Sequence, residues 1–237
     1  LIIISEGKEA IIDHFNTDPG KIKVLRERNK NDLADQLLAI DQLANIEFIY
    51  QKEQLGLGDA IYCGSQFTGA EPFAVLLGDN IIISDSKDTI LKQMVNQYNY
   101  FQSSIVAVSE VPKKMVYKYG VLDGTYTEKG DLLKVKDWVE KPTVDLAPSN
   151  LVVSGLYILD HQIFECLAHT QEGYGGEIQL TDAMRQLLTH QDMYAFQFKG
   201  KRYDIGNKLD FIKTNLVQGL LDSDINAELS KWLKEFS

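Results

Sequence analysis

The sequence is poor in cysteine, contains no long apolar run and has no excess of positive charge. Two cysteines, Cys63 and Cys166, occur among 237 residues and form no CxxC motif, so we expect no disulfide framework and a reducing, cytoplasmic compartment. No apolar run approaches the ~20 residues of a membrane span, which predicts that the protein has no membrane partner. The formal net charge of −10 argues against a nucleic-acid partner, since such proteins carry a basic patch or stripe.

The remaining composition is that of an ordinary globular protein, with 44% hydrophobic and 24% charged residues. The four histidines show no spacing typical of zinc ligands. We predict a single domain over residues 1–237. The chain begins with Leu1-Ile2-Ile3-Ile4, which is typical of a buried strand and carries neither an initiator methionine nor a signal-peptide pattern. Because a buried strand needs neighbours on both sides, we expect an amino-terminal part of a longer protein to precede Leu1.

Five apolar residues from Phe73 to Leu77 follow one another without a polar break. Such a run is typical of a central parallel strand that is buried on both faces. Gly78 and Asp79 come next, at the carboxyl end of this strand, where ligands bind in open α/β sheets. A carboxylate there suits Mg²⁺, which prefers oxygen ligands and is usually shared with substrate phosphates. A polar turn that merely closes a core strand explains residues 78–80 equally well.

The segment from Gln51 to Ala60 combines a polar strand end, the glycines Gly56 and Gly58, and small residues that open a helix. Glycines at a helix start let a flat ring or a phosphate approach backbone N–H groups. The Gln51 amide offers one acceptor and two donors, enough to bind the edge of a pyrimidine. A plain glycine-containing loop between a strand and a helix is the alternative.

Two later segments place charges at predicted strand ends. Glu140 and Lys141 precede Pro142, where they could bind a sugar hydroxyl and a phosphate, or form a surface pair before a turn that proline imposes. Residues 199–208 are the densest cationic segment near a strand end and contain a second candidate carboxylate, Asp204. Gly155 lies inside a β-rich run, where glycine often marks the close approach of another backbone.

The order of elements predicts an α/β fold. Strands alternate with helices as far as residues 105–108, which implies crossover connections and a mainly parallel sheet. Residues 119–122, 132–139 and 151–159 are also strand-like but are separated by turns, so we interpret them as a small antiparallel insertion whose inward polar residues would cover a bound ligand. The predicted fold is therefore Rossmann-like, with a mixed, mainly parallel sheet that is flanked by helices. The last helix carries an apolar stripe that suits either internal packing or a subunit contact, formed by Leu229, Trp232, Leu233 and Phe236.

Six motifs in register along the chain resemble the sugar-1-phosphate nucleotidyltransferases. The match is closest to the branch of bacterial UTP–glucose-1-phosphate uridylyltransferases, and Leu77-Gly78-Asp79-Asn80 is also similar to the thymidylyl branch. The motifs are Gln51-Lys52-Glu53-Gln54-Leu55-Gly56-Leu57-Gly58-Asp59-Ala60, Glu71-Pro72-Phe73-Ala74-Val75-Leu76-Leu77-Gly78-Asp79, Val139-Glu140-Lys141-Pro142, Ala147-Pro148-Ser149-Asn150, Gly175-Gly176-Glu177-Ile178-Gln179-Leu180-Thr181-Asp182 and Lys199-Gly200-Lys201 through Asp204.

This resemblance implies a reaction in which UTP and glucose 1-phosphate give UDP-glucose and pyrophosphate with the help of Mg²⁺. It also implies a homo-oligomer. The site residues that it implies are Gln51 and Gly56 for the uracil, Gly78 near the ribose, Asp79 and Asp204 for Mg²⁺, Gly120, Glu140 and Gly155 for the glucose, Lys141 for the glucose phosphate, and Tyr157 near the sugar phosphate.

One departure from the family pattern is large. The glycine-rich signature loop, whose Arg and Lys cradle the triphosphate, has no counterpart in this sequence, which starts at what would be the second strand. We therefore expect these 237 residues to be inactive alone and part of a complete enzyme. Two alternatives to the uridylyltransferase stay open: a thymidylyltransferase acting on the same sugar phosphate, and a non-catalytic regulatory paralogue that binds a UDP-sugar.

Overall fold

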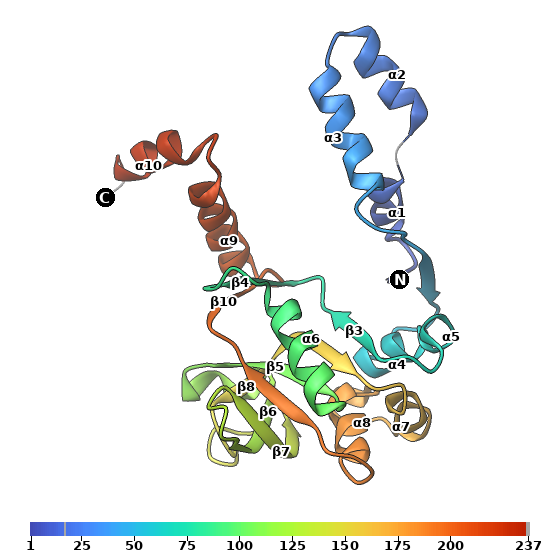
Figure 1. The fold of residues 1–237 in the computed structure, drawn as a ribbon, viewed down its shortest axis with the longest axis vertical. Helices are drawn as coiled ribbons and strands as arrows, with labels where there is room; N and C mark the ends of the chain where they lie inside the picture. Colours follow the sequence, from blue (N-terminus) through green and yellow to red (C-terminus); the bar gives the residue numbers. More distant parts are fainter. Residues whose placement is uncertain (17, 236–237) are drawn as a thin grey trace. The chain divides into compact units, whose positions relative to one another are not determined.

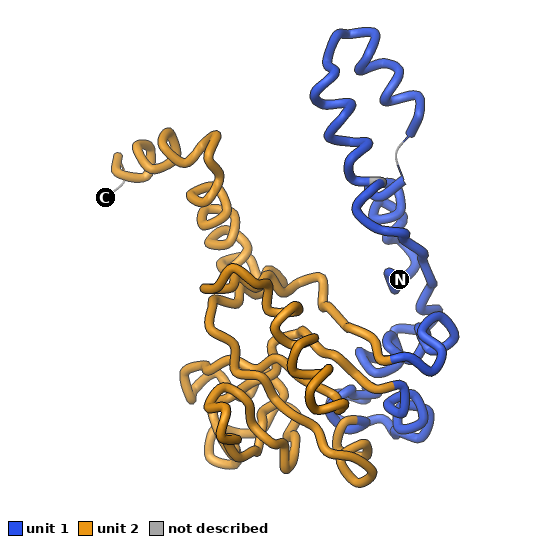
Figure 2. Tube along the Cα trace, viewed as in Figure 1, with its two compact units in different colours: residues 1–71, 161–183 blue, residues 72–160, 184–237 orange. Residues whose placement is uncertain are grey.

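The computed structural model describes residues 1–16 and 18–235, which divide into two compact units (Figure 2). Unit 1 comprises Leu1–Glu71 and His161–Ala183, and unit 2 comprises Pro72–Asp160 and Met184–Ser237. Helix α8 (Leu180–Leu187) begins in the first unit and ends in the second. Among the described residues, none of the helices combines the length and the apolar composition that a membrane crossing requires.

Unit 1 contains a two-stranded parallel sheet and a set of short helices (Figure 1). Strands β1 (Ile2–Ser5) and β2 (Phe48–Gln51) pair in register from Ile2 opposite Phe48 to Ser5 opposite Gln51. The helical elements of this unit are α1 (Glu9–Phe15), α2 (Pro19–Glu27), α3 (Asn31–Asp41), α4 (Leu57–Tyr62), α5 (Ser65–Thr68), α7 (Ile163–His169) and the 3₁₀ turn η2 (Tyr174–Gly176).

Local signals in the sequence explain the helical hairpin of α2 and α3. Asp18 caps α2 by accepting a hydrogen bond from the Gly20 backbone N–H at 2.8 Å, and Pro19 occupies the first turn, where its missing N–H costs nothing. Arg26 of α2 then donates to Asp35 of α3 across the hairpin at 2.7 Å. This ion pair is exposed, so we expect it to fix the geometry of the hairpin more than its stability.

Unit 2 is built on a six-stranded mixed sheet in the order β3-β8-β5-β9-β7-β6 (Figure 1). The β5–β9 pair is parallel, whereas β3–β8, β5–β8, β7–β9 and β6–β7 are antiparallel, and β6 also pairs with β8. The strands are β3 (Phe73–Leu76), β5 (Ile105–Glu110), β6 (Gly120–Tyr126), β7 (Leu132–Glu140), β8 (Leu151–Leu159) and β9 (Tyr194–Gln197). The α/β fold class is thus confirmed, but the expectation of a mainly parallel sheet is wrong for the described strands.

Strand β8, and not residues 73–80, is the interior strand of this sheet that is buried along its whole length. All nine residues of β8 are buried, and the strand has β3, β5 and β6 as neighbours. Strand β3 is antiparallel to β8 and alternates in burial, with Leu76 61% exposed. The prediction of a central parallel strand over 73–80 is therefore wrong. The separate antiparallel insertion predicted over 119–122, 132–139 and 151–159 is also wrong, because all three segments belong to this one six-stranded sheet. An apolar run indicates burial, but the long-range pairing of strands decides which run lies in the middle.

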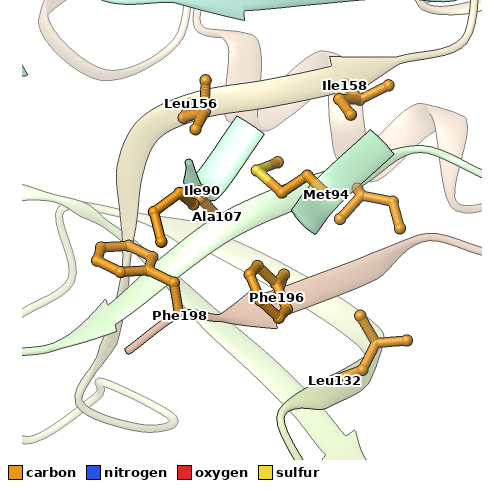
Figure 3. Packing of buried hydrophobic residues seen from close by; sticks show 9 residues of the cluster. Ile90, Met94, Ala107, Leu132, Leu156, Ile158, Phe196 and Phe198 are labelled. Carbon is orange, nitrogen blue, oxygen red and sulfur yellow. The ribbon is translucent and has the colours of Figure 1, made fainter. Parts of the chain in front are cut away.

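Helix α6 (Ile90–Phe101) covers one face of the sheet and completes its core (Figure 3). Thr89 caps the helix by accepting from the Lys92 backbone N–H at 3.2 Å. The helix positions Ile90 and Met94 face inward, as their helical spacing predicts. They pack against side chains from four strands, Ile105, Ala107, Leu132, Leu156, Ile158 and Phe196, and against Phe198, which follows β9.

A second, two-stranded sheet joins β4 (Asn80–Ser84) and β10 (Gly200–Asp204) in antiparallel register. The 3₁₀ helix η1 (Lys113–Lys118) precedes β6, and α9 (Lys208–Leu221) and α10 (Asn226–Lys234) end the unit. Helix α10 contacts α9, because a Cβ atom at Gly219 would lie 2.7 Å from Leu229 Cδ2. Of the stripe that the sequence predicts on the last helix, Trp232 is 49% exposed, and Phe236 lies outside the described residues.

Candidate active site

Two carboxylates meet where β10 ends beside the start of β4. Asp79 immediately precedes β4, and Asp204 is the last residue of β10, opposite Asn80 in the antiparallel register. The Ile205 backbone N–H donates to the Asp79 carbonyl oxygen at 2.8 Å, which ties the two turns together. A Cβ atom at Gly206 would lie 3.1 Å from Asp204 Oδ1 and 3.5 Å from Asp79 Oδ2. Both carboxylates therefore border one small volume, although they lie far apart in the sequence.

The donor set around this volume suits a divalent metal that is shared with a substrate. Among residues 1–16 and 18–235, no group of three or more His, Cys, Asp and Glu side chains is placed to hold a metal ion. Two carboxylates leave most ligand positions to water and phosphate oxygens, which is how proteins usually bind Mg²⁺ at phosphate-transferring sites. Asp79 is exposed and Asp204 is half-buried, so a ligand can reach both side chains.

Gly78 lies in the turn between β3 and β4. A Cβ atom there would meet no atom of the described residues within 4 Å, so the turn is open at this point. Backbone hydrogen bonds hold the turn in place, from the Leu77 N–H to the Gly155 carbonyl at 2.9 Å and from the Asn80 N–H to the Leu77 carbonyl at 3.1 Å. A cavity of about 180 Å³ borders the turn and is lined mainly by apolar side chains from β3, β4, α6 and β8.

The β6–β7 hairpin brings three of the predicted sugar-site residues together. Gly120 pairs directly with Glu140, and Lys141 follows at the end of β7. The Lys141 backbone has a φ of 43°, and its N–H donates to the Tyr119 carbonyl at 3.0 Å. Lys141 Nζ lies 3.8 Å from Glu140 Oε1, and the two side chains are 32% and 15% exposed. Left-handed backbone at a residue other than glycine is costly and is concentrated at functional sites, which supports a role for this turn.

Tyr157 of β8 is buried among charged groups of this site. Its side chain is 4% exposed, and burial is the main cause that raises the pKa of the phenol well above its ordinary value. The negative charges of Glu140 and Asp79 raise this pKa further, whereas the positive charge of Arg202 lowers it. The phenol therefore keeps its proton across the physiological range and can only act there as a neutral hydrogen-bonding group.

The two residues expected at the uracil belong to unit 1 and contact one another. Gln51 ends β2, and its Nε2 donates to Asp59 Oδ2 at 2.7 Å and to the Gly56 carbonyl at 3.2 Å. Gly56 precedes α4 with a φ of 116°, and a Cβ atom there would lie 2.8 Å from Glu177 Cβ and 2.9 Å from the Ile178 carbonyl oxygen. Only glycine fits this position, because the segment of Glu177 packs directly against it.

Sequence reasoning did not single out two residues that the structure places at these positions. Asn80 donates from Nδ2 to Asp79 Oδ1 at 2.6 Å. Arg202 stacks its guanidinium 4.5 Å from the centre of the Tyr119 ring and donates to the Val153 carbonyl at 3.3 Å. Strand alternation was the available signal for Arg202, because it lies two residues before Asp204 and so shares its face of β10.

Comparison with known proteins identifies the class. The family model described as nucleotidyl transferase matches residues 9–218, and the chain therefore belongs to the nucleotidyl transferase family. A UTP–glucose-1-phosphate uridylyltransferase of Staphylococcus haemolyticus (strain JCSC1435) is 43% identical over 235 residues, which cover 99% of this chain and 81% of that protein. The resemblance drawn from the six motifs is thus confirmed.

Solved structures agree with this placement. A UTP-bound UGPase from Acinetobacter baumannii superposes with a TM-score of 0.90 at 31% identity and covers 99% of this chain and 83% of that chain. A UDP-glucose pyrophosphorylase complexed with UDP-glucose has a TM-score of 0.80 at 40% identity, covering 89% of this chain and 76% of that chain. A putative glucose-1-phosphate thymidylyltransferase from Bacillus anthracis, at 21% identity and a TM-score of 0.57, shares the fold.

Proposed function

We propose that this chain transfers a uridylyl group from UTP to glucose 1-phosphate, giving UDP-glucose and pyrophosphate. The observation that carries the proposal is the convergence of the Asp79 and Asp204 carboxylates beside Gly206, in a chain whose relatives are named for this reaction. Carboxylates that share one volume would repel one another without a cation, so the pair suits a divalent metal that is bound together with phosphate.

In the proposed reaction, a phosphate oxygen of glucose 1-phosphate attacks the α-phosphorus of UTP. The new P–O bond forms as the bond between the α-phosphorus and the bridging oxygen breaks, and pyrophosphate leaves with that electron pair. A phosphate monoester has its second pKa near 6, so it is already an anionic nucleophile and no general base is required. The protein must then position two anions and offset their repulsion.

We assign these tasks to residues of unit 2. Asp79 and Asp204 would hold Mg²⁺, which when bound would neutralise phosphate charge. Lys141 would bind the phosphate of the sugar as a point charge. The left-handed backbone of Lys141 and the 3.8 Å distance from its Nζ to Glu140 Oε1 would direct its ammonium group toward the sugar phosphate. Glu140 would accept a hydrogen bond from a glucose hydroxyl.

The remaining sugar contacts are assigned to the neighbours of this pair. Gly120, which is the cross-strand partner of Glu140, and Gly155 would let the sugar approach the backbone. Tyr157 would donate its retained phenolic proton near the sugar phosphate. The open turn at Gly78 would lie against the ribose.

The uracil is assigned to Gln51 and Gly56 of unit 1. The Nε2 donors of Gln51 already serve Asp59 and the Gly56 carbonyl, so its Oε1 would accept from the N3–H of uracil. Uracil and thymine present the same edge to such an amide and differ by the C5 methyl group. Discrimination between UTP and dTTP would therefore depend on contacts other than that of Gln51.

The test is pyrophosphate release from glucose 1-phosphate with Mg²⁺ and either UTP or dTTP, measured on residues 1–237 alone, which we expect to be inactive, and on a longer protein that carries the signature loop ahead of them. The proposal expects faster release with UTP, and expects Asp79→Asn to lose at least a hundredfold in rate while its thermal unfolding stays unchanged. Preference for dTTP would identify a thymidylyltransferase instead. UDP-glucose binding without turnover of either nucleotide, in the longer protein as well as in residues 1–237, would identify a regulatory paralogue.

Three broader properties accompany this proposal. We propose that residues 1–237 serve one reaction as a single nucleotidyltransferase domain. A reducing, cytoplasmic location is supported by Cys63 and Cys166, both of which are free thiols. A homo-oligomer is supported by the large apolar side chains that α9 and α10 expose, Leu209, Phe211, Ile212, Leu220, Leu221 and Trp232.

A further inference from the structure

The side chain of Asn80 connects the Asp79 carboxylate to strand β8 of unit 2. Its Nδ2 donates to Asp79 Oδ1 at 2.6 Å, and a hydrogen bond to an ionised acceptor is about twice as strong as one between neutral groups. The other oxygen, Asp79 Oδ2, is the one that lies 3.5 Å from the Cβ position at Gly206, beside Asp204. The donation therefore holds one oxygen and directs the second into the volume that the two carboxylates share.

The orientation of the Asn80 amide is not explained by its own hydrogen bonding. Within the described residues its Oδ1 is buried and has no hydrogen-bond partner, and burying an unpaired acceptor costs free energy. Turning the amide over would place that oxygen against the Asp79 carboxylate, where two acceptors would repel one another. The amide thus leaves its own carbonyl unsatisfied in order to donate to Asp79.

Gly155 provides the space that this arrangement needs. Its φ is 76°, and a Cβ atom there would lie 2.8 Å from Asn80 Nδ2 and 2.9 Å from Asn80 Cγ. The register of β5 against β8 shifts beside this glycine, between Val106 and Val108. The bulge and the missing side chain together form the slot in which the Asn80 amide lies.

We propose that Asn80 is a positioning residue for the metal ligand Asp79, and that Gly155, whose φ of 76° by itself already favours glycine, also leaves the room that the Asn80 amide occupies. This inference rests on the metal role of Asp79 in the proposed function. It gives Gly155 a task that differs from contact with the sugar. Partners that orient a metal ligand from outside the coordination shell typically change metal affinity or activity 10–100-fold when they are removed.

The experiment measures metal binding directly, with Mn²⁺ as the probe because carboxylate sites that suit Mg²⁺ also suit Mn²⁺. Mn²⁺ is titrated into the protein saturated with UDP-glucose, and free Mn²⁺ is followed by its paramagnetic resonance signal. Asn80→Ala is expected to weaken Mn²⁺ binding by about tenfold or more and to raise the Mg²⁺ concentration needed for half-maximal activity by a similar factor. Its thermal unfolding midpoint should stay within a few degrees of that of the unaltered protein. Asn96→Ala, on the exposed side of α6, is the matched control and should change none of these.

Gly155→Ala closes a double-mutant cycle. As a single substitution, Gly155→Ala should weaken Mn²⁺ binding about as much as Asn80→Ala does. In the double variant, Gly155→Ala should weaken Mn²⁺ binding little further, because the Asn80 amide through which it acts has been removed. Additive losses would overturn the assignment of Gly155. A rise in KM for glucose 1-phosphate in Asn80→Ala with unchanged Mn²⁺ affinity would overturn the role of Asn80 and leave the proposed function intact. If the unaltered protein bound no Mn²⁺ saturably, the metal role itself would fail, and this inference with it.

Discussion

Gly206→Ala is a sharp perturbation of the proposed metal site, because it adds one methyl group to the volume between Asp79 and Asp204. The added carbon would lie 3.1 Å from Asp204 Oδ1, which is closer than an ordinary van der Waals contact, so that oxygen must move by a few tenths of an ångström. Ligand distances in a well-formed metal site vary by only about 0.2 Å. We therefore expect metal affinity to fall about tenfold, which corresponds to about 1.4 kcal/mol.

The same substitution should not destabilise the fold. The φ of Gly206 lies outside the left-handed region that favours glycine, so alanine can adopt the native backbone, and it also lowers the entropy of the unfolded chain. Such replacements stabilise proteins by about 0.4–1 kcal/mol. The close contact with Asp204 Oδ1, which also accepts from the Gly206 N–H at 3.0 Å, offsets part of this gain. Stability is therefore expected to change little while metal affinity falls, a combination that a general loss of structure cannot produce.

The assay pairs Mn²⁺ titration with urea unfolding on the same protein samples. Gly64→Ala is a matched control, since its added carbon would meet the Ile61 carbonyl oxygen at a similar 3.2 Å but lies outside the candidate site. Unchanged Mn²⁺ affinity in Gly206→Ala, with weakened affinity in Asp79→Asn, would show that the metal does not occupy the volume beside Gly206, and the geometric argument would be refuted.

Three further predictions concern the sugar phosphate, the core and the buried phenol. Lys141→Ala should raise KM for glucose 1-phosphate by about 10–100-fold and KM for UTP much less, because hydrogen bonds to charged groups contribute about 1.5–3 kcal/mol; the exposed Lys136→Ala on the same strand is the control. Met94→Ala removes a fully buried side chain of the α6 core and should lower the free energy of unfolding by about 2–5 kcal/mol in urea titrations. Burial raises the pKa of the Tyr157 phenol in the folded state, so above about pH 10 the phenol ionises in the unfolded chain but not in the folded one. Stability therefore falls as pH rises, and Tyr157→Phe should reduce that fall.

Each of these expectations has a contrary result. Equal KM changes for both substrates in Lys141→Ala would remove its assignment to the sugar phosphate. A loss below about 1 kcal/mol in Met94→Ala would mean that the core relaxes into the space that methionine leaves. An unaltered slope of stability against pH between 9 and 11 in Tyr157→Phe would mean that the phenol ionises equally in both states.

The sequence predicted elements better than it predicted their pairing. The apolar spacing within residues 90–98 predicts one apolar helix face, because that signal is contained within a few turns of one helix. Ile90 and Met94 of this pattern are buried, whereas Val95 is 40% exposed. Residues 73–77 and 151–159 are both apolar runs, and nothing local indicates which of them is central. Three neighbouring strands surround β8, and those contacts involve residues distant in the sequence.

For the candidate site, residue types were more informative than the geometry that was expected for them. Asp79 was placed at the carboxyl end of a parallel strand, whereas it lies in the turn before β4, which is antiparallel to β10. In an antiparallel pair the start of one strand adjoins the end of the other, and this brings Asp79 to Asp204. The two carboxylates are adjacent for a reason that local sequence patterns do not contain.

Asn80 shows why such sites depend on contacts that a motif does not reveal. In the sequence it is simply the residue after a carboxylate, and asparagine is common in turns for reasons of its own. The structure adds that its acceptor is buried with no hydrogen-bond partner in the part of the chain that is described, and that Gly155, on another strand, leaves room for its amide. An arrangement that leaves one polar atom unsatisfied is retained only where the hydrogen bond that it permits outweighs the loss, and here that bond is to Asp79. The position of Asp79 therefore depends on β8 as well as on its own turn, which links this buried strand to the proposed chemistry.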